Sequence, residues 1–283
     1  MSGSNPGALR ISVVMAYYNR RNLLLRTLQT ICRSAVARDC EVIVVDDGSR
    51  DDERVDDLQG RYPFDLRVIR VDARFKSWTN PCVPLNIGFR FVRGDLVVLQ
   101  NPECLHVGDI LLASLRESRD DNYLAFGCYS ADRRVTEALA SVDYGRSDWV
   151  AAIRHAIAPL RDAGTREDGT AGWYNHSVHK PTAFNFCTAI RYRNLARLGG
   201  FDERFAYGMA FDDNEWLYRV TKIGLGVRFI DEPFVIHQFH GATDYGKNPQ
   251  GYARNYRLFE QVRQGQGDCR VQSVFFQPRG TSA

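Results

Sequence analysis

The chain has 283 residues, 44% of them hydrophobic and 25% charged, which is typical of a soluble folded protein and excludes a disordered, collagen-like or disulfide-stapled chain. Its 37 basic side chains are nearly balanced by 34 acidic ones, and a net charge of +3 is too small to favour nucleic acid as the main partner. Only four of the basic residues are lysine. Arginine therefore dominates, and its guanidinium binds phosphates through two parallel hydrogen bonds.

The ends and the cysteines bear on the cellular compartment. No apolar run approaches the length of about 18 residues that a membrane helix needs, so we expect no transmembrane segment. Residues 1–10 lack the apolar core of a secretory signal. Seven cysteines without a Cys-X-X-Cys pair indicate reduced thiols. We expect a cytoplasmic protein, and leave open a peripheral contact with the inner membrane face and an oligomeric state.

The first half of the chain alternates short apolar runs with amphipathic stretches. Runs too short for helices and rich in Val, Ile and Leu predict buried strands at Ile11–Ala16, Glu41–Val45, Leu66–Val71, Asp95–Leu99 and Tyr123–Tyr129. Helices are predicted between them at Leu23–Ile31, Asp52–Leu58 and Val83–Val92. Strands that alternate with helices are typical of a doubly wound, parallel sheet.

The pattern weakens over residues 130–182, where we expect loops and short helices that cover one side of a site. It returns further along, with strands predicted at Asn185–Ile190 and Gly226–Ile230 and helices at Arg191–Leu198, Asp213–Ile223 and Pro249–Gln264.

Ligands of open α/β sheets bind outside the carboxyl ends of the strands. Three such ends carry distinctive polar residues, namely Ala16–Asn19, Asp46–Ser49 and Gln100–Glu103. A carboxylate there can accept hydrogen bonds from a ribose or a base, although Asp46–Ser49 can equally be a solvated turn. No Gly-X-Gly-X-X-Gly follows the first strand, which argues against a dinucleotide fold.

The combination of these motifs is more specific than any one of them. Val13–Arg20 followed by Glu41–Arg50 closely resembles the opening of family 2 glycosyltransferases with the GT-A fold. Later blocks agree with that family in order and spacing: Asn86–Gly88, Gly94–Leu99, Gly199–Phe205 and Asp212–Arg219. The resemblance covers about residues 11–240. It implies a single α/β, Rossmann-like domain with a mixed, mostly parallel sheet flanked by helices.

The resemblance also implies how this domain is divided. The parts are a flexible tail over 1–10, a nucleotide-sugar-binding half over 11–129, an acceptor-binding and catalytic half over 130–245, and a C-terminal helix and tail over 246–283.

The nucleotide site follows from the resemblance. It comprises Ala16, Tyr18, Asn19, Asp46, Asp47 and Asn86. Asp47 is the expected contact to base and ribose, and Asp46 is its supporting neighbour. Tyr18 can alternatively be a packing aromatic at the strand end. UDP is the default nucleotide in the family.

The family's Asp-X-Asp metal motif is absent here, and Asn101-Pro102-Glu103 occupies its place. A carboxylate and an amide oxygen suit a hard divalent cation. The family often takes a further ligand from a late histidine, where His237 and His240 lie. Imidazole suits Mn²⁺ better than a purely oxygen site does, so Mn²⁺ or Mg²⁺ is expected. A metal-free turn and structural histidines remain the alternative.

Three carboxylates, Asp212, Asp213 and Glu215, open a predicted helix. Acidic residues favour helix N-termini anyway, but the resemblance makes Asp213 the catalytic base. We expect Asp212 and Glu215 to raise its pKa and Arg219 to pair with the cluster. Trp173 is expected to support the acceptor by stacking on a sugar ring, or else to pack within a loop.

The resemblance implies an inverting, metal-assisted transferase that moves a sugar from a nucleotide-diphosphate donor to a hydroxyl of a glycan, lipid-linked or small-molecule acceptor. No Gln/Arg-X-X-Arg-Trp signature of processive synthases follows, so we expect one sugar per encounter. The missing Asp-X-Asp leaves open a metal-independent enzyme or an inactive sugar-nucleotide-binding homologue. A nucleotidyltransferase is disfavoured because Ala16–Asn19 contains no glycine.

Overall fold

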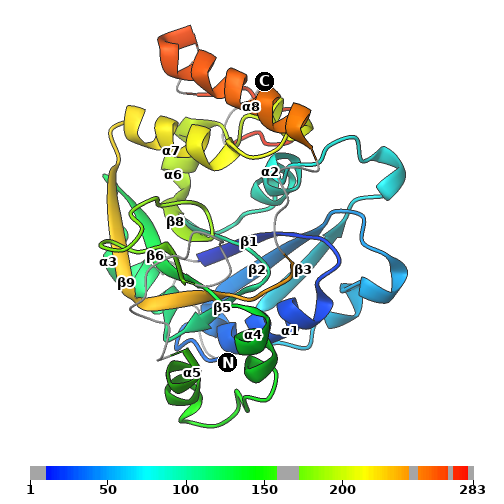
Figure 1. Ribbon diagram of the computed structural model, residues 1–283, viewed down its shortest axis with the longest axis vertical. Coiled ribbons are helices and arrows are strands. Elements are labelled where there is room, and N and C mark those ends of the chain that lie inside the picture. The colour runs from blue at the N-terminus through cyan, green and yellow to red at the C-terminus, as the bar shows by residue number, and fades with distance from the viewer. Residues whose placement is uncertain (1–10, 158–171, 242–247, 267–269, 280–283) are drawn as a thin grey trace.

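The computed structural model describes residues 11–157, 172–241, 248–266 and 270–279 (Figure 1). Within these ranges nine strands form one sheet in the order β3-β2-β1-β4-β8-β6-β9-β5, with β7 paired to β6. The strands are β1 Ile11–Tyr17, β2 Cys40–Asp46, β3 Asp65–Arg70, β4 Leu96–Gln100, β5 Cys104–Val107, β6 Asn122–Ser130, β7 Gly172–Asn175, β8 Cys187–Arg191 and β9 Gly226–His237.

The first four strands of this sheet are parallel, and the rest are mixed. β1 pairs in parallel with β2 and β4, and β2 with β3. β8 is antiparallel to β4 and β6, and β5 is antiparallel to β9. The carboxyl ends of β1, β2 and β4 therefore share one edge, as the sequence predicted. The expected single α/β domain with a mixed sheet is confirmed.

Helices cover both faces of the sheet. They are α1 Arg21–Ile31, α2 Cys82–Arg90, α3 Ile110–Glu117, α4 Arg133–Leu139, α5 Trp149–Ile157, α6 Tyr192–Leu198, α7 Asp212–Lys222 and α8 Pro249–Gln261. In Figure 1, α2, α6, α7 and α8 lie at one side of the sheet and α1, α4 and α5 at the other. Single-turn helices occur at Ala37–Asp39, Asp51–Glu53, Asp56–Leu58, Ala73–Phe75 and Glu203–Tyr207, and a further turn, Val262–Gln266, follows α8.

Alternate residues of β1 pack into two hydrophobic clusters, one on each face of the sheet. Val13 and Met15 pack with α1 on one face, while Val14 packs with Phe89 of α2 and Trp216 of α7 on the other. Burial on both faces explains why these strands read as continuous apolar runs instead of alternating with polar residues. A third cluster lies under α4 and α5.

The predicted elements are found with shifted ends. The strand expected at Gly226–Ile230 continues to His237, and the polar helix expected at Asp52–Leu58 is two single turns. The segment expected to be loops and short helices contains α4, α5 and β7, while 158–171 and the N-terminal tail lie outside the described residues. β5 and α3 were not predicted, because β5 has only four residues and directly follows a proline turn.

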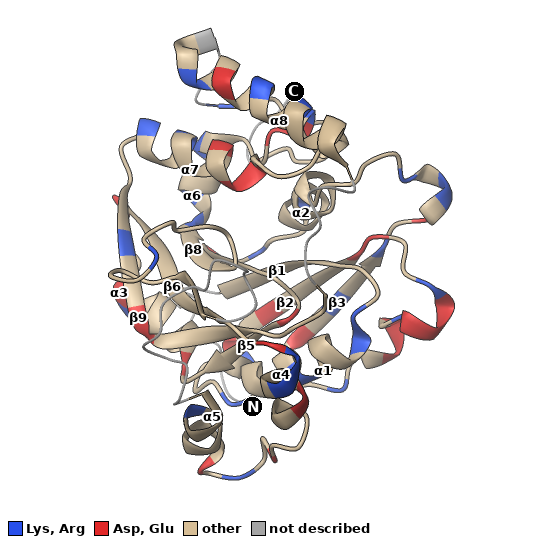
Figure 2. Cartoon of the chain, in the orientation of Figure 1, with Lys and Arg blue, Asp and Glu red and all other residues tan. Residues whose placement is uncertain are grey.

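Charge is spread over the molecule. Figure 2 shows basic segments on α4, α7 and α8 and on the loops, with acidic segments between them, which fits the small net charge. No helix in the described ranges has the length and apolar character to cross a bilayer.

Candidate functional site

The loop after β2 is shaped by Asp46. Its carboxylate is fully buried, accepts a hydrogen bond from the Ser49 amide at 2.8 Å and pairs with Arg70 at 2.9 Å. Gly48 has φ +79°, and a Cβ there would lie 3.1 Å from Ala73, so the turn requires glycine. Asp46 therefore supports the loop from beneath, as expected of a neighbour of the ligand-binding residue.

Asp47 points the other way, toward two donors from the following loop. Lys76 Nζ lies 2.7 Å from its Oδ2, and Trp78 Nε1 donates to its Oδ1 at 2.9 Å. Burial raises the pKa of Asp47, and Lys76 and Trp78 oppose that rise. Lys76 also lies 4.3 Å from the ring centre of Tyr18, whose side chain is 48% exposed. These residues form one charged and aromatic group at the strand edge.

The end of β1 is tied to the end of β2. Ala16 lies opposite Val45 in the sheet. The Asn19 amide donates to Ser49 Oγ at 3.0 Å, and Asn19 Oδ1 accepts from the Arg50 amide at 2.9 Å. The structure thus brings the predicted residues of both loops together, with the exception of Asn86.

Asn86 is placed differently from the prediction. Its side chain is fully buried, donates to the Phe201 carbonyl and Glu203 Oε1, both at 2.9 Å, and accepts from the Phe201 amide at 2.8 Å. A Cβ on residue 200 would lie only 2.5 Å from Asn86 Oδ1, so the close contact requires Gly200. Asn86 therefore fastens α2 to the loop after α6, and the nucleotide-binding assignment is corrected to a structural one because its polar atoms are used inside the protein.

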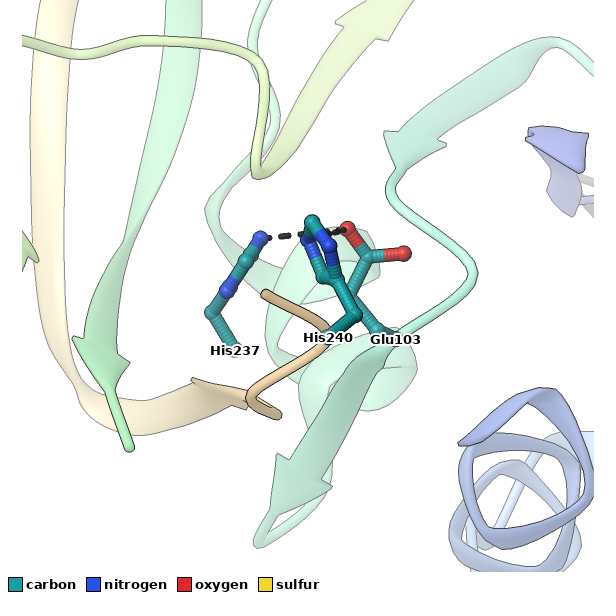
Figure 3. A group of neighbouring side chains, drawn as sticks. All are labelled: Glu103, His237 and His240. Carbon is teal, nitrogen blue, oxygen red and sulfur yellow. Dashed lines mark ion pairs between the residues drawn. The ribbon is translucent and has the colours of Figure 1, made fainter. Parts of the chain in front are cut away.

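Glu103, His237 and His240 converge at the other end of this edge (Figure 3). Glu103 lies on the turn between β4 and β5, and His237 ends β9 opposite Cys104. The Nε2 atoms of His237 and His240 lie 3.1 and 3.3 Å from Glu103 Oε1. Arg20 Nη1 reaches the same oxygen at 2.9 Å.

The electrostatics of this triad favour an ionised carboxylate. Burial alone would raise the pKa of Glu103, but Arg20 and the two imidazoles hold it well below its usual range. Its second oxygen, Oε2, is buried and has no hydrogen-bond partner among the described residues. A buried carboxylate oxygen without a partner is costly, so Glu103 has an unsatisfied acceptor beside the oxygen that faces the imidazoles.

The donor set fits a divalent first-row cation. Ligands about 2.1 Å from a metal at right angles to each other are about 3.0 Å apart, close to the observed separations of the imidazole nitrogens from Oε1. Two imidazoles with one carboxylate favour a borderline cation such as Mn²⁺ over Ca²⁺. Asn101, expected as a further ligand, lies on the same turn and lines the neighbouring cavity.

That cavity, of about 110 Å³, holds Asp212 and Asp213 at the start of α7. Asn185 donates its backbone amide and its side-chain amide to Asp213 Oδ1, at 3.1 and 2.7 Å. Asn80 donates to Asp212 Oδ1 at 2.8 Å. Burial and then the charge of Asp212 raise the pKa of Asp213 to about 7, against the hydrogen bonds from Asn185.

Glu215 and Arg219 form a separate pair behind this cavity. Both are fully buried, with Arg219 Nε 2.5 Å from Glu215 Oε1, and Arg219 also donates to the carbonyls of Leu198 and Gly200. The expected pairing of Arg219 is found. Glu215 was expected to raise the pKa of Asp213, but burial and Asp212 are what raise it, while Arg219 neutralises Glu215 inside the core. Arg219 also holds the loop that Asn86 contacts.

Trp173 is likewise a core residue. It is 2% exposed and packs edge-on against Tyr129 and Phe234 in the third cluster. Its ring face is therefore covered by protein, which corrects its prediction as a sugar-stacking residue.

The backbone leading into α7 is strained. Ala210 and Phe211 have φ of 59° and 66°, a left-handed conformation that is uncommon outside glycine. Asn255 of α8 donates to the Ala210 carbonyl at 2.9 Å, and the Phe211 ring packs against Tyr252. Strain of this kind persists only where surrounding contacts impose it. Helix α8 thus sets the position of the residues just before Asp213.

Sequence reasoning missed four residues that the structure places here: Arg20, Lys76, Asn80 and Asn185. Only Arg20 carried a usable signal, since it is the last residue of the motif Val13–Arg20. The others are brought to the site by loops that contact strand ends far along the chain.

Comparison with known proteins finds similarity to glycosyltransferases. Residues 12–140 match the model of Glycosyl transferase family 2. Chondroitin synthase of Escherichia coli is 24% identical over 81% of this chain and 34% of its own length. Validoxylamine A glucosyltransferase of Streptomyces hygroscopicus subsp. jinggangensis is 30% identical over 86% of this chain and 58% of its own. The chain thus spans between a third and three fifths of these relatives.

Solved structures share the fold at low identity. The mannosyltransferase PcManGT from Pyrobaculum calidifontis, in complex with GDP-Man and Mn²⁺, aligns with a TM-score of 0.54 at 17% identity, covering 91% of this chain and 65% of its own. S. aureus TarS 1–349 in complex with UDP-GlcNAc aligns with a TM-score of 0.58 at 13% identity, covering 89% and 65%. The chain therefore has the GT-A fold, and its residues 12–140 are similar to glycosyl transferase family 2.

Proposed function

We propose that the protein transfers a sugar from a nucleotide-diphosphate donor to an acceptor hydroxyl, with inversion at the anomeric carbon. The observation that carries the proposal is the Asp213 carboxylate, which lines the cavity. Its pKa of about 7 suits a general base. The turn from Gln100 to Glu103 joins this cavity to the triad, because Gln100 and Asn101 line the cavity and Glu103 belongs to the triad. The cavity that contains the proposed base and the triad are thus adjoined by one short turn.

The donor nucleotide is assigned to the edge formed by β1 and β2. Asp47 retains lone pairs beside Lys76 and Trp78, so it can accept a hydrogen bond from a base N–H. Tyr18, Ala16 and Asn19 complete this side. UDP is the default nucleotide, supported by the TarS complex with UDP-GlcNAc, although PcManGT is in complex with GDP-Man.

The leaving group is assigned to the triad. Glu103, His237 and His240 would hold a divalent cation, Mn²⁺ in preference to Mg²⁺, through one carboxylate oxygen and two imidazole nitrogens. Such a cation supplies positive charge that stabilises the departing diphosphate. The burial of Glu103 keeps its charge from being screened by water.

The chemical step follows from Asp213. Asn185 holds Oδ1, so Oδ2 is the oxygen that takes the proton of the acceptor hydroxyl. The acceptor oxygen attacks the anomeric carbon on the face opposite the diphosphate, and the bond from that carbon to the diphosphate oxygen breaks. A single displacement of this kind inverts the configuration. Alignment of the reacting atoms contributes much of the rate.

We assign the nucleotide-sugar half to residues 11–129 and the acceptor half to 130–245, with one sugar added per encounter. The acceptor hydroxyl belongs to a glycan, a lipid-linked sugar or a small molecule. These assignments rest on the family resemblance and on the position of Asp213 in the second half.

The test combines binding with turnover. Thermal unfolding is measured with UDP, GDP and their sugars, with and without Mn²⁺, since a ligand of the native state raises the midpoint. Transfer is then measured for the wild type, for Asp213→Asn and for a control at an exposed acid, Asp52→Asn. We expect Asp213→Asn alone to lose transfer while keeping the nucleotide-induced shift. Near-normal transfer by Asp213→Asn would show that another group is the base.

A metal-independent transferase is the second candidate. It is favoured by the missing Asp-X-Asp and by Arg20, which already places a positive charge on Glu103. Turnover in EDTA, followed by addition of Mn²⁺, separates the two. Unchanged turnover in EDTA would favour the second candidate.

A further inference from the structure

Arg20 connects the nucleotide loop to the triad. It directly follows Asn19, and its backbone is fixed because its amide donates to the Tyr17 hydroxyl at 3.2 Å and its carbonyl accepts from the Leu24 amide at 3.0 Å. Its side chain, one third exposed, crosses to Glu103 Oε1 at 2.9 Å. The arginine therefore starts in one half of the site and ends in the other.

The contact uses only part of the guanidinium. Nη1 donates to Glu103, and among the described residues no hydrogen bond involves Nε or Nη2. A guanidinium has five N–H donors in a fork that matches phosphate oxygens. Most of this capacity is therefore available to an anion that reaches the exposed side of Arg20.

Arg20 also competes with a cation. Glu103 Oε1 is the oxygen that faces both imidazoles, so a cation held by the triad would bind the atom that Arg20 contacts. Two positive charges on one oxygen repel each other strongly in a buried site. Without a cation, however, Arg20 compensates a buried carboxylate that would otherwise be costly to keep ionised.

We propose that Arg20 is a positioning residue that exchanges Glu103 for the donor diphosphate when a cation binds the triad. The inference rests on the proposed function, since it requires a diphosphate ligand beside the triad. The diphosphate gives the displaced guanidinium a new anionic partner, and the vacated oxygen is left to the cation. Cation and nucleotide consequently bind with positive coupling.

The coupling has a sign that distinguishes it from a supporting role. If Arg20 only held Glu103 in place, its removal would weaken cation binding. If Arg20 competes with the cation, its removal strengthens binding of the cation alone and weakens binding of the nucleotide. Because coupling is reciprocal, the factor by which UDP tightens Mn²⁺ binding equals the factor by which Mn²⁺ tightens UDP binding.

The experiment titrates the full chain with Mn²⁺ alone, followed by the electron paramagnetic resonance signal of free Mn²⁺, and then repeats the titration with saturating UDP. The variants are Arg20→Gln, Arg20→Lys and the control Arg33→Gln, which removes an exposed arginine just beyond α1. For Arg20→Gln we expect Mn²⁺ alone to bind at least about fivefold more tightly, at the lower end of usual coupling factors. UDP should bind this variant more weakly, and the UDP-induced gain in Mn²⁺ affinity should shrink.

The controls separate failure of this inference from failure of the proposed function. Arg20→Lys keeps the charge, so it should bind Mn²⁺ alone like the wild type, and Arg33→Gln should change neither affinity. If His240→Ala abolishes Mn²⁺ binding but Arg20→Gln leaves it equal or weaker, the metal site stands and the exchange is wrong. If the wild type binds no Mn²⁺ at all, both the metal site and the exchange are overturned.

Discussion

Asn185 donates two hydrogen bonds to the same oxygen of Asp213, one from its backbone amide and one from its side-chain amide. The Tyr123 hydroxyl in turn donates to Asn185 Oδ1, which fixes the amide so that its NH₂ group faces Asp213. Within the described residues no hydrogen bond reaches Asp213 Oδ2. The arrangement orients the carboxylate and leaves one oxygen for a ligand.

Replacing Asn185 by alanine removes the shorter of these two bonds and leaves the other. The carboxylate loses a donor that stabilises its charged form, so the pKa of Asp213 rises further. We expect kcat to fall roughly tenfold, as for loss of one oriented hydrogen bond, and the acid limb of the rate profile to move to higher pH. Donor affinity measured by calorimetry should stay unchanged. A fall in donor affinity with an unshifted limb would contradict this role.

The pH profile of the wild type tests the base directly. Asp213 must be deprotonated to take a proton, and its pKa is about 7, so kcat/KM should fall as pH drops below 7. Asp212→Asn removes the neighbouring negative charge that raises this pKa. The limb should then move to lower pH by on the order of one unit. An unmoved limb in Asp212→Asn would mean that a different group titrates.

Stability should depend on pH through the same carboxyl group. The folded-state pKa of about 7 lies above the usual aspartate pKa of 3.8, so the native state binds the proton more strongly than the unfolded state and loses stability as pH rises from 3.8 to 7. Asp213→Asn should therefore raise the free energy of unfolding at pH 8, by on the order of 1–2 kcal/mol for this partly exposed side chain, and leave it unchanged near pH 4. Urea titrations at both pH values measure it. Equal stabilisation at pH 4 would contradict the explanation.

The Asn86→Ala variant tests whether Asn86 has a structural role or binds the nucleotide. Asn86→Ala leaves the buried Phe201 amide without its side-chain acceptor and should lower the free energy of unfolding by about 2–3 kcal/mol. UDP affinity of the folded protein, measured by calorimetry below the unfolding range, should stay within about twofold of the wild type. A large loss of UDP affinity in folded Asn86→Ala would restore the original nucleotide assignment.

The sequence was most informative where local pattern decides structure. Continuous apolar runs predicted β1, β2 and β4, because strands buried on both faces need no polar residue. The polar residues at their ends followed from the topology. His237 and His240 were predicted with Glu103 from the resemblance, and the structure brings all three together.

What the sequence could not indicate was the direction of individual side chains. Asn86 and Trp173 are residue types found in sugar sites, yet one faces a loop amide and the other a packed cluster. Arg20 and Asn185 act across 83 and 28 residues of chain, respectively. Such contacts depend on how loops close in three dimensions, which neither periodicity nor composition encodes.

The position of β9 in the sheet has a consequence for how the protein is made. This strand is the last of the described sheet along the chain, yet it lies between β6 and β5, and it carries His237 at its end. The two earlier strands cannot complete their pairing until β9 has left the ribosome and inserted between them. Long-range pairing of this kind is slow to form. Glu103, His237 and His240 therefore come together only after β9 has paired with β5 and β6. A cation that binds these three residues would bind only to chains whose sheet is complete.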